Sequence, residues 1–287
     1  MTLRSVLYGL LFVFFWSSAF TSARMIVEDA PPVTALAVRF FLMGVIAVGI
    51  AKWQGQSWHL TPAQWKSTLI FGVCQNALYL GLNFYAMQTV EASLASIIAS
   101  SMPLLVALIG WVFWRDRIKP LGQLGLVLGL VGVGIIMGYR MESGVDVQGV
   151  LLCAIAALAL AVATLSVRGA STGGNVLMIV GLQGFVGAMV LAVVAFFTET
   201  FEVNWTLQLG LAFSYTLIFP GLVATWIWFN LVNDIGALRA STFHFLNPFF
   251  GVTVAAILLD EQMALTDWVG VFVVMAGILA VQLSKQR

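Results

Sequence analysis

Chemically active side chains are scarce in this chain, and the most conspicuous set lies in the segment ASTFHFLNP, residues 240–248. His244 and Asn247 are three positions apart, so on a helix they share one face and can bind a polar solute together. Pro248 has no backbone N–H and leaves the carbonyl of His244 without its helical partner. We predict that His244 and Asn247 contact a substrate and that Pro248 is a hinge. A neutral His244 bonded to a neighbouring helix and a static proline kink are the alternatives.

A second segment, ASIIASSMP at residues 95–103, has a similar composition and the same ending. Ser96 and Ser100 precede Pro103, which frees the carbonyl of Ala99 in the same manner. Hydroxyl groups can hold the polar end of a solute or bind neighbouring helices. We predict that Ser96 and Ser100 belong to the substrate site and that Pro103 is a second hinge.

Polar residues also recur in the segment CQNALYLGLNFYAMQ, residues 74–88. Asn76, Tyr79 and Asn83 follow near-helical spacing and form a polar stripe in an otherwise apolar helix. Such a stripe either lines a cavity or bonds helices to one another. We predict that Tyr79 and Asn83, together with Trp16 near the N-terminus, line an amphipathic cavity with aromatic and amide walls.

Arg39 is the one charged residue placed deep within an apolar segment. At 1.5 Å per residue it lies about 9 Å along the helix from Val33. Its guanidinium could bind a substrate carboxylate, or it could extend outward to Glu28 or Asp29. We favour the structural role for Arg39.

The sequence offers no other chemistry of its own. The only histidines are His59 and His244, and Cys74 and Cys153 lack any CxxC spacing, so metal binding is not expected. Phosphate-loop and HExxH motifs are absent, and no nucleophile–base set or long loop for a catalytic module is visible. We therefore predict no enzyme activity, no cofactor, no metal and no nucleic-acid partner.

The composition identifies lipid as the main solvent of this chain. Hydrophobic residues make up 61% and charged residues 9%, with a mean hydropathy of +1.01, whereas soluble domains are about one-quarter charged. A membrane-spanning helix needs about 20 mainly apolar residues. Ten such stretches are predicted, at residues 6–25, 33–51, 67–88, 92–113, 120–138, 147–167, 175–197, 209–232, 237–259 and 265–283.

Charge placement orients these spans. With the N-terminus in the cytoplasm, ten of the thirteen Lys and Arg residues fall on the cytoplasmic side, and ten of the twelve acidic residues fall on the other. Basic loops remain inside. We predict that both termini are cytoplasmic.

The sequence also contains an internal repeat. Shifted by 145 positions, residues 80–137 align without a gap on residues 225–282. The shift pairs Pro103 with Pro248, Gly125 with Gly270, and Gly132 with Gly277. Each half then has five spans, an odd number, so the second half is inverted in the membrane. We predict two five-helix repeats, residues 1–140 and 141–287, a plan found in secondary transporters. The glycines of 122–138 allow close helix packing, which we assign to contacts within a monomer rather than to a dimer.

Two five-helix copies, the segment ALAVRFFLMG at 35–44 and the paired AS…P endings resemble the drug/metabolite transporter superfamily, EamA type. Within it the chain is most similar to bacterial amino-acid exporters of the YddG kind. The resemblance implies a ten-helix inner-membrane carrier for neutral or aromatic amino acids and similar small organic molecules. It also implies that the third, fourth, eighth and ninth helices frame a central cavity and flex during alternating access.

We therefore predict an all-α, ten-helix secondary transporter of the bacterial inner membrane that exports neutral or aromatic amino acids. A multidrug or metabolite exporter of the same fold, for example one for lipophilic cations, is the alternative. A cavity with aromatic and neutral polar walls suits a zwitterion or a neutral amphiphile, and cation–π contacts keep lipophilic cations open. The expected partners are a small-molecule substrate and the lipid bilayer.

Overall fold

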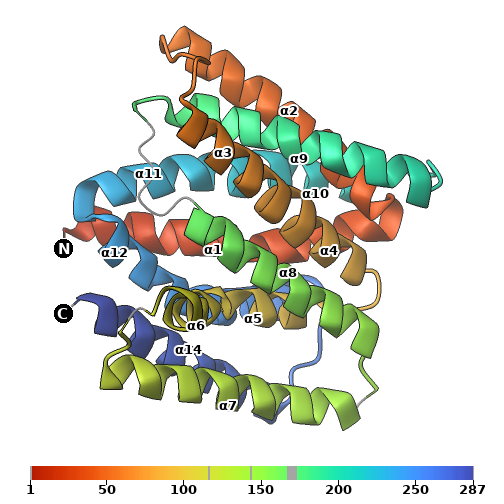
Figure 1. Ribbon diagram of the computed structural model, residues 1–287. Coiled ribbons are helices and arrows are strands. Elements are labelled where there is room, and N and C mark those ends of the chain that lie inside the picture. Colours follow the sequence, from red (N-terminus) through yellow and green to blue (C-terminus); the bar gives the residue numbers. More distant parts are fainter. Residues whose placement is uncertain (1, 116, 143, 167–172, 287) are drawn as a thin grey trace.

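The computed structural model describes residues 2–286 except 116, 143 and 167–172, and the fold is entirely helical in this part of the chain (Figure 1). Ten helical spans are long and apolar enough to cross a membrane, which confirms the predicted number. The first half contains α1 (Leu3–Asp29), α2 (Pro32–Trp53), α3 (Pro62–Phe71), η1 (Gly72–Tyr79), α4 (Leu80–Ala86), α5 (Ala92–Ser100), α6 (Met102–Trp114) and α7 (Pro120–Glu142). The second half contains α8 (Val147–Ser166), α9 (Val176–Thr198), α10 (Leu207–Thr216), η2 (Leu217–Val223), α11 (Ala224–Ile235), α12 (Ala237–Ala240), η3 (Ser241–Leu246), α13 (Asn247–Leu258) and α14 (Leu265–Gln286).

Local sequence signals set where several helices begin. Pro32 and Pro62 occupy the first turn of α2 and α3, where the missing N–H costs nothing. Acidic side chains far away in the sequence complete two other helix starts. The carboxylate of Glu199 accepts hydrogen bonds from two N–H groups at the start of α2, both at 2.8 Å. Glu261 does the same for α5, at 2.7 and 3.0 Å. Glu199 and Glu261 therefore each cap the start of a helix from the other half of the chain.

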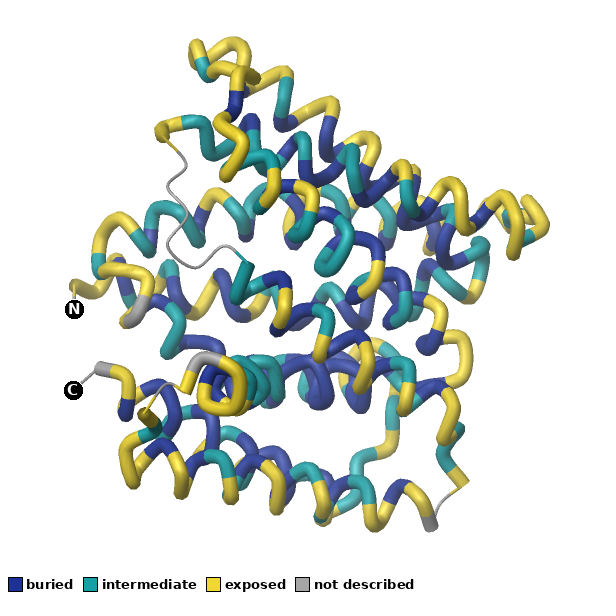
Figure 2. Tube along the Cα trace, in the orientation of Figure 1, coloured by how far each residue is buried: buried dark blue, intermediate teal, exposed yellow. Residues whose placement is uncertain are grey.

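Two close-packed helix pairs lie on opposite sides of the molecule: α2 with α9, and α7 with α14 (Figure 1). Each pair joins corresponding helices of the two repeats. Figure 2 shows that buried residues gather along the inward sides of the helices, while exposed residues follow the outer sides of α2 and α7. The exposed residues of α7 include large apolar side chains such as Leu130, as expected for a surface that contacts lipid.

Glycines hold α7 against α14 by reciprocal contacts. A Cβ added at Gly125 would lie 2.6 Å from the carbonyl oxygen of Gly277, and one added at Gly277 would lie 2.7 Å from that of Gly125. Gly132 and Gly270 meet in the same way, at 2.9 and 3.0 Å. The sequence repeat aligns the same four glycines, pairing Gly125 with Gly270 and Gly132 with Gly277. The glycines of α7 thus pack within the monomer.

The two repeats share their helix irregularities as well as their helices. The third span is interrupted by the π-helix η1 at residues 72–79, and the eighth by the π-helix η2 at 217–223, which is the same place shifted by 145. The fourth span breaks between α5 and α6, and the ninth changes from the 3₁₀-helix η3 to α13. Pro103 and Pro248 each sit in the first turn of the new segment. Irregular backbone therefore recurs at matched depth in both halves.

The glycine contacts predict a sharp difference between two positions of α7. Gly132→Ala places a methyl group within 3 Å of the backbone of α14, and such overpacking typically costs about 1–3 kcal/mol. Gly134→Ala is the matched control, because a Cβ there meets nothing within 4 Å. We expect a lower melting temperature for Gly132→Ala and an unchanged or slightly higher one for Gly134→Ala, measured on purified protein in detergent. Equal melting temperatures would contradict the packing described here.

Candidate functional site

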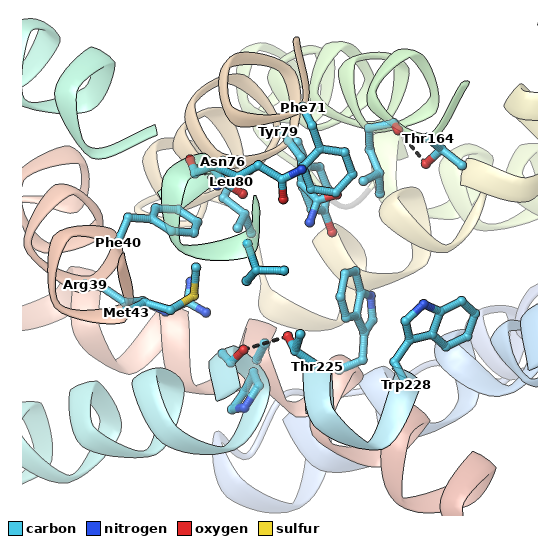
Figure 3. A pocket seen from close by; sticks show the side chains of 18 of the residues that line it. Arg39, Phe40, Met43, Phe71, Asn76, Tyr79, Leu80, Thr164, Thr225 and Trp228 are labelled. Carbon is cyan, nitrogen blue, oxygen red and sulfur yellow. Dashed lines mark hydrogen bonds between the residues drawn. The ribbon is translucent and has the colours of Figure 1, made fainter. Parts of the chain in front are cut away.

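A cavity of about 490 Å³ lies between the repeats, within the ~300–1,000 Å³ typical of small-molecule sites. Its walls come from α1, α2, the third span, α8, α9 and the eighth span. Figure 3 shows Arg39 and Met43 on one side, Asn76 and Tyr79 on a second, and Trp228 across the space from Arg39. The lining therefore combines aromatic rings and uncharged amides with aliphatic side chains.

The fourth and ninth spans contribute less to this wall than the family resemblance implies. Each supplies one lining residue, Met102 from α6 and His244 from η3. The reason is that α5 and α13 pack on each other, and α1 packs on both of them. The first span therefore takes the place beside the cavity that the resemblance gives to the fourth and ninth.

Four of the seven predicted substrate residues line the cavity: Trp16, Tyr79, Asn83 and His244. Tyr79 and Asn83 are buried, and the Asn83 amide nitrogen donates to the Tyr79 carbonyl at 2.8 Å. The Oδ1 atom of Asn83 has no hydrogen-bond partner. It is thus a buried acceptor beside the cavity.

His244 lies in a box of aromatic rings. Its ring centroid is 5.3 Å from that of Phe12, 5.4 Å from Trp228 and 6.2 Å from Trp16. The rings meet His244 edge-on or tilted, geometries that suit their quadrupoles. The box presents a mainly apolar surface with one imidazole.

Asn247 supports His244 instead of lining the cavity. Its Nδ2 lies 3.0 Å from the His244 Nδ1, on the shared face that the spacing predicted. Its backbone carbonyl accepts from the Ser17 hydroxyl at 3.2 Å. The carbonyl of His244, which Pro248 cannot serve, accepts from the Asn247 N–H in the 3₁₀ pattern. The proline break is thereby satisfied without water.

Ser96 and Ser100 lie in the helix crossing between α5 and α13, outside the cavity lining. The Ser96 hydroxyl faces Gly251, where an added Cβ would lie only 1.8 Å away. Ser100 donates to the Ser96 carbonyl at 2.7 Å. Ser96 thus lets α5 and α13 cross closely, and Ser100 provides a hydrogen bond to a backbone carbonyl just before the helix break. A substrate contact by either one stays a prediction.

Arg39 lines the cavity and differs from the other charged groups of the spans. Its side chain is 6% exposed, and its Nε has no hydrogen-bond partner. The Nη2 atom lies 3.7 Å from the position that a Cβ at Gly221 would take, and the Met43 Sδ atom lies 3.8 Å from the same position. Neither Glu28 nor Asp29, the partners expected for a structural role, pairs with it among the described contacts.

The cavity is closed at the end far from the termini. Ala23, Phe84 and Met87 are buried there, and Arg24 donates to the Met87 carbonyl while pairing with Glu28 at 3.6 Å. Toward the end that carries both termini, the lining side chains are only half-buried. These are Gln64, Ser67, Thr164 and Val176. Among the described residues, the lining is thus less buried toward the termini end than at the far end.

Sequence reasoning missed two lining residues of the aromatic box, Phe12 and Trp228. Trp226, two positions before Trp228, is instead 55% exposed. The π-helix η2 precedes this segment and shifts its rotation relative to a regular α-helix, so helical spacing points to the wrong face. Phe12 carries no such signal, because the first span is apolar on all sides.

Comparison with known proteins agrees with this architecture. Residues 3–138 and 147–283 each match the EamA-like transporter family, one match on each repeat. The chain is 23% identical to the uncharacterized transporter YvbV of Bacillus subtilis, covering 97% of this chain and 91% of that protein. It is 24% identical to the uncharacterized inner membrane transporter YedA of Escherichia coli, with the same coverage. A solved crystal structure matches the whole chain with a TM-score of 0.71 at 18% identity and supports the fold. The protein is therefore a membrane transporter that belongs to the EamA-like transporter family.

Proposed function

We propose that the protein exports neutral and aromatic amino acids, and related small organic molecules, by alternating access. The observation that carries this proposal is the lining of the cavity. Aromatic rings gather around His244, uncharged amides project from the third span and from α9, and no Asp or Glu is among the described lining residues. Such a wall accommodates an apolar side chain together with a small polar head group.

The unpaired Asn83 Oδ1 supports a zwitterionic substrate, because it can accept a hydrogen bond from an ammonium group. A multidrug exporter for lipophilic cations is the rival. The aromatic box favours such cations through cation–π contacts, but Arg39 places a positive charge in the same cavity, with no carboxylate nearby to offset it. Electrostatics therefore favours a substrate that carries a carboxylate.

We propose that the protein lies in the bacterial inner membrane with both termini in the cytoplasm. The E. coli relative is named an inner membrane transporter, and basic residues gather at the termini side. With this orientation the cavity opens to the cytoplasm, where an exporter takes up its substrate. No ATP-binding motif is present. Flow down the gradient of a concentrated cytoplasmic amino acid then supplies the driving force.

We further propose that Pro103 and Pro248 act as hinges, one in each of the two repeats at residues 1–140 and 141–287. Backbone that leaves the α-helical pattern bends more readily, and all four irregular spans meet near the cavity. The α2–α9 and α7–α14 pairs are held by close backbone contacts and would move as rigid units.

A transport assay tests the substrate class. Purified protein in liposomes loaded with labelled Phe, Met, Thr or Glu should release the three neutral amino acids faster than Glu, because one cation cannot balance a second carboxylate. Liposomes without protein set the leak rate. If none of these amino acids leaves above that rate while a lipophilic cation does, the drug-exporter function replaces the one proposed here.

Cysteine accessibility tests the orientation and the closed end together. In a background lacking Cys74 and Cys153, Ser67→Cys should react with a membrane-impermeant maleimide applied to inside-out vesicles. Met87→Cys, at the closed end, should react poorly from either side. His59→Cys and Glu202→Cys, both exposed at opposite ends, report the two sides. Labelling of Ser67→Cys only in right-side-out vesicles would reverse the proposed orientation.

Pro248→Ala tests the hinge. The substitution restores a backbone donor near the carbonyl of His244 and favours a continuous helix. We expect transport to slow by about tenfold or more, which corresponds to about 1.4 kcal/mol in the barrier, while the melting temperature is maintained. The lipid-facing variant Ile257→Ala serves as the control on α13. Wild-type rates in Pro248→Ala would show that the break only shapes packing.

A further inference from the structure

Arg39 is a buried cation for which the fold supplies no counter-ion. It lies on α2, about 10 Å from the helix start at Pro32 at 1.5 Å per residue, and only 6% of it is exposed. The described structure gives the guanidinium no ion pair and no hydrogen bond. Its one recorded neighbour of electrostatic interest is the ring of Phe40, 5.2 Å away.

The carboxylates that could reach Arg39 are occupied. Glu28 pairs with Arg24 at 3.6 Å and accepts from Gln208 at 3.3 Å. Asp29 accepts from Asn204 and Thr206, at 2.9 and 2.5 Å. These contacts join the first span to residues 204–208 around the start of α10, and they engage both carboxylates away from Arg39.

Arg140 shows what this fold does with a structural arginine. It is equally buried, and it binds both carboxylate oxygens of Asp267, at 3.2 and 3.0 Å, with Glu91 at 2.5 Å. A buried charge without such partners is costly, so the presence of Arg39 at this position points to a partner that is not part of the chain. Arg39 faces the cavity, and the partner must therefore come from the cavity.

The surroundings define what that partner is. A planar guanidinium with free donors suits a carboxylate, which can accept two parallel hydrogen bonds. Gly221, in the π-helix η2, leaves space rather than a side chain beside Nη2. The corresponding helix of the second repeat, α9, carries no charged residue at all. The cavity thus provides for one negative charge and not for two.

The aromatic box fixes the other end of the substrate. Trp228 lies seven residues before the end of α11 at the termini side, also about 10 Å along its helix. Arg39 and the box therefore sit at different depths of a hydrocarbon layer that is ~30 Å thick. A molecule that spans this separation places a carboxylate at Arg39 and an apolar group among Phe12, Trp16 and Trp228.

We propose that Arg39 is the residue that recognises substrate, and that it requires one carboxylate on an apolar or aromatic molecule. The amino group is secondary, because only neutral acceptors such as Asn83 Oδ1 face it. This proposal adds the recognised group to the proposed function, and it rests on that function only for the assumption that the substrate binds in this cavity. Neutral amino acids form one part of this class, and amine-free aromatic monocarboxylates form another.

The experiment compares acids with their amides on purified full-length protein. The ligands are phenylalanine, phenylalaninamide, 3-phenylpropionate and 3-phenylpropionamide. Binding is read from the ligand-induced shift in melting temperature, and transport of the labelled acids is read in liposomes. The variants are Arg39→Gln, Arg39→Lys and the control Lys52→Gln, which removes an exposed cation from the same helix.

We expect both acids, and neither amide, to stabilise the wild type and Lys52→Gln. Arg39→Gln should bind the acids at least about tenfold more weakly, since a hydrogen bond to a charged group is lost. Arg39→Lys should retain part of the affinity, because it keeps the charge and loses the fork. Ligand-free Arg39→Gln should melt no lower than the wild type, because the substitution removes an unpaired buried charge. A purely structural arginine would give a lower melting temperature and unchanged affinity.

Several results overturn the proposal, and they separate it from the amino-acid function. Equal binding of acid and amide by the wild type, or of acid by Arg39→Gln, would refute recognition by Arg39, whether or not amino acids are transported. Failure of both acids to stabilise the wild type would refute it as well. Arg39-dependent binding of 3-phenylpropionate without any binding or transport of amino acids would uphold Arg39 and refute amino-acid export. The wild-type comparison of acid with amide is decisive even if a variant fails to fold.

Discussion

The fold depends on one constraint: backbone N–H and C=O groups cannot be left unpaired in a hydrocarbon layer. Regular helices meet this requirement at the periphery, where α2, α7, α9 and α14 are uninterrupted. The irregular segments η1, η2 and η3 occur in the interior, next to a cavity and to other helices. There a backbone group that loses its α-helical partner finds another one nearby. For example, the carbonyl of His244 cannot accept from Pro248, which lacks an N–H, and accepts from the Asn247 N–H instead. The periphery is therefore regular and the interior can vary.

This division explains which features the sequence could predict. Ten spans and two repeats follow from long apolar runs and from prolines and glycines with fixed structural effects, and both are confirmed. The cavity was predicted in part: Tyr79 and Asn83 line it because a polar stripe in an apolar helix has few other uses. Trp228 was missed because the π-helix η2 alters the rotation of the helix that follows it. Phe12 was missed because the first span is apolar on all sides, so no single face is marked as lining a cavity. Ser96 and Ser100 lie at the crossing of α5 and α13 and not in the cavity lining, because a helix crossing also selects small hydroxyl residues.

Arg39 illustrates a different limit of sequence analysis. The sequence shows that a charged residue lies in a span, but whether nearby acids are available to it depends on residues about 170 positions away. Glu28 and Asp29 were reasonable partners by distance along the chain, and they are taken by Gln208, Asn204 and Thr206. The function of such a charge follows from what its neighbours already bind, and only a three-dimensional structure shows that.

The reciprocal glycine contacts between α7 and α14 have a consequence for the origin of the molecule. The repeat aligns Gly125 with Gly270 and Gly132 with Gly277. The contacts are crossed: Gly125 meets Gly277, and Gly132 meets Gly270. An interface of this kind is isologous, the arrangement found in two-fold dimers. A single five-helix half thus already contains both sides of the seam, and an ancestor could have assembled from two antiparallel copies. Within a single chain the two halves need not be identical, and α2 carries Arg39 while the corresponding helix α9 is uncharged.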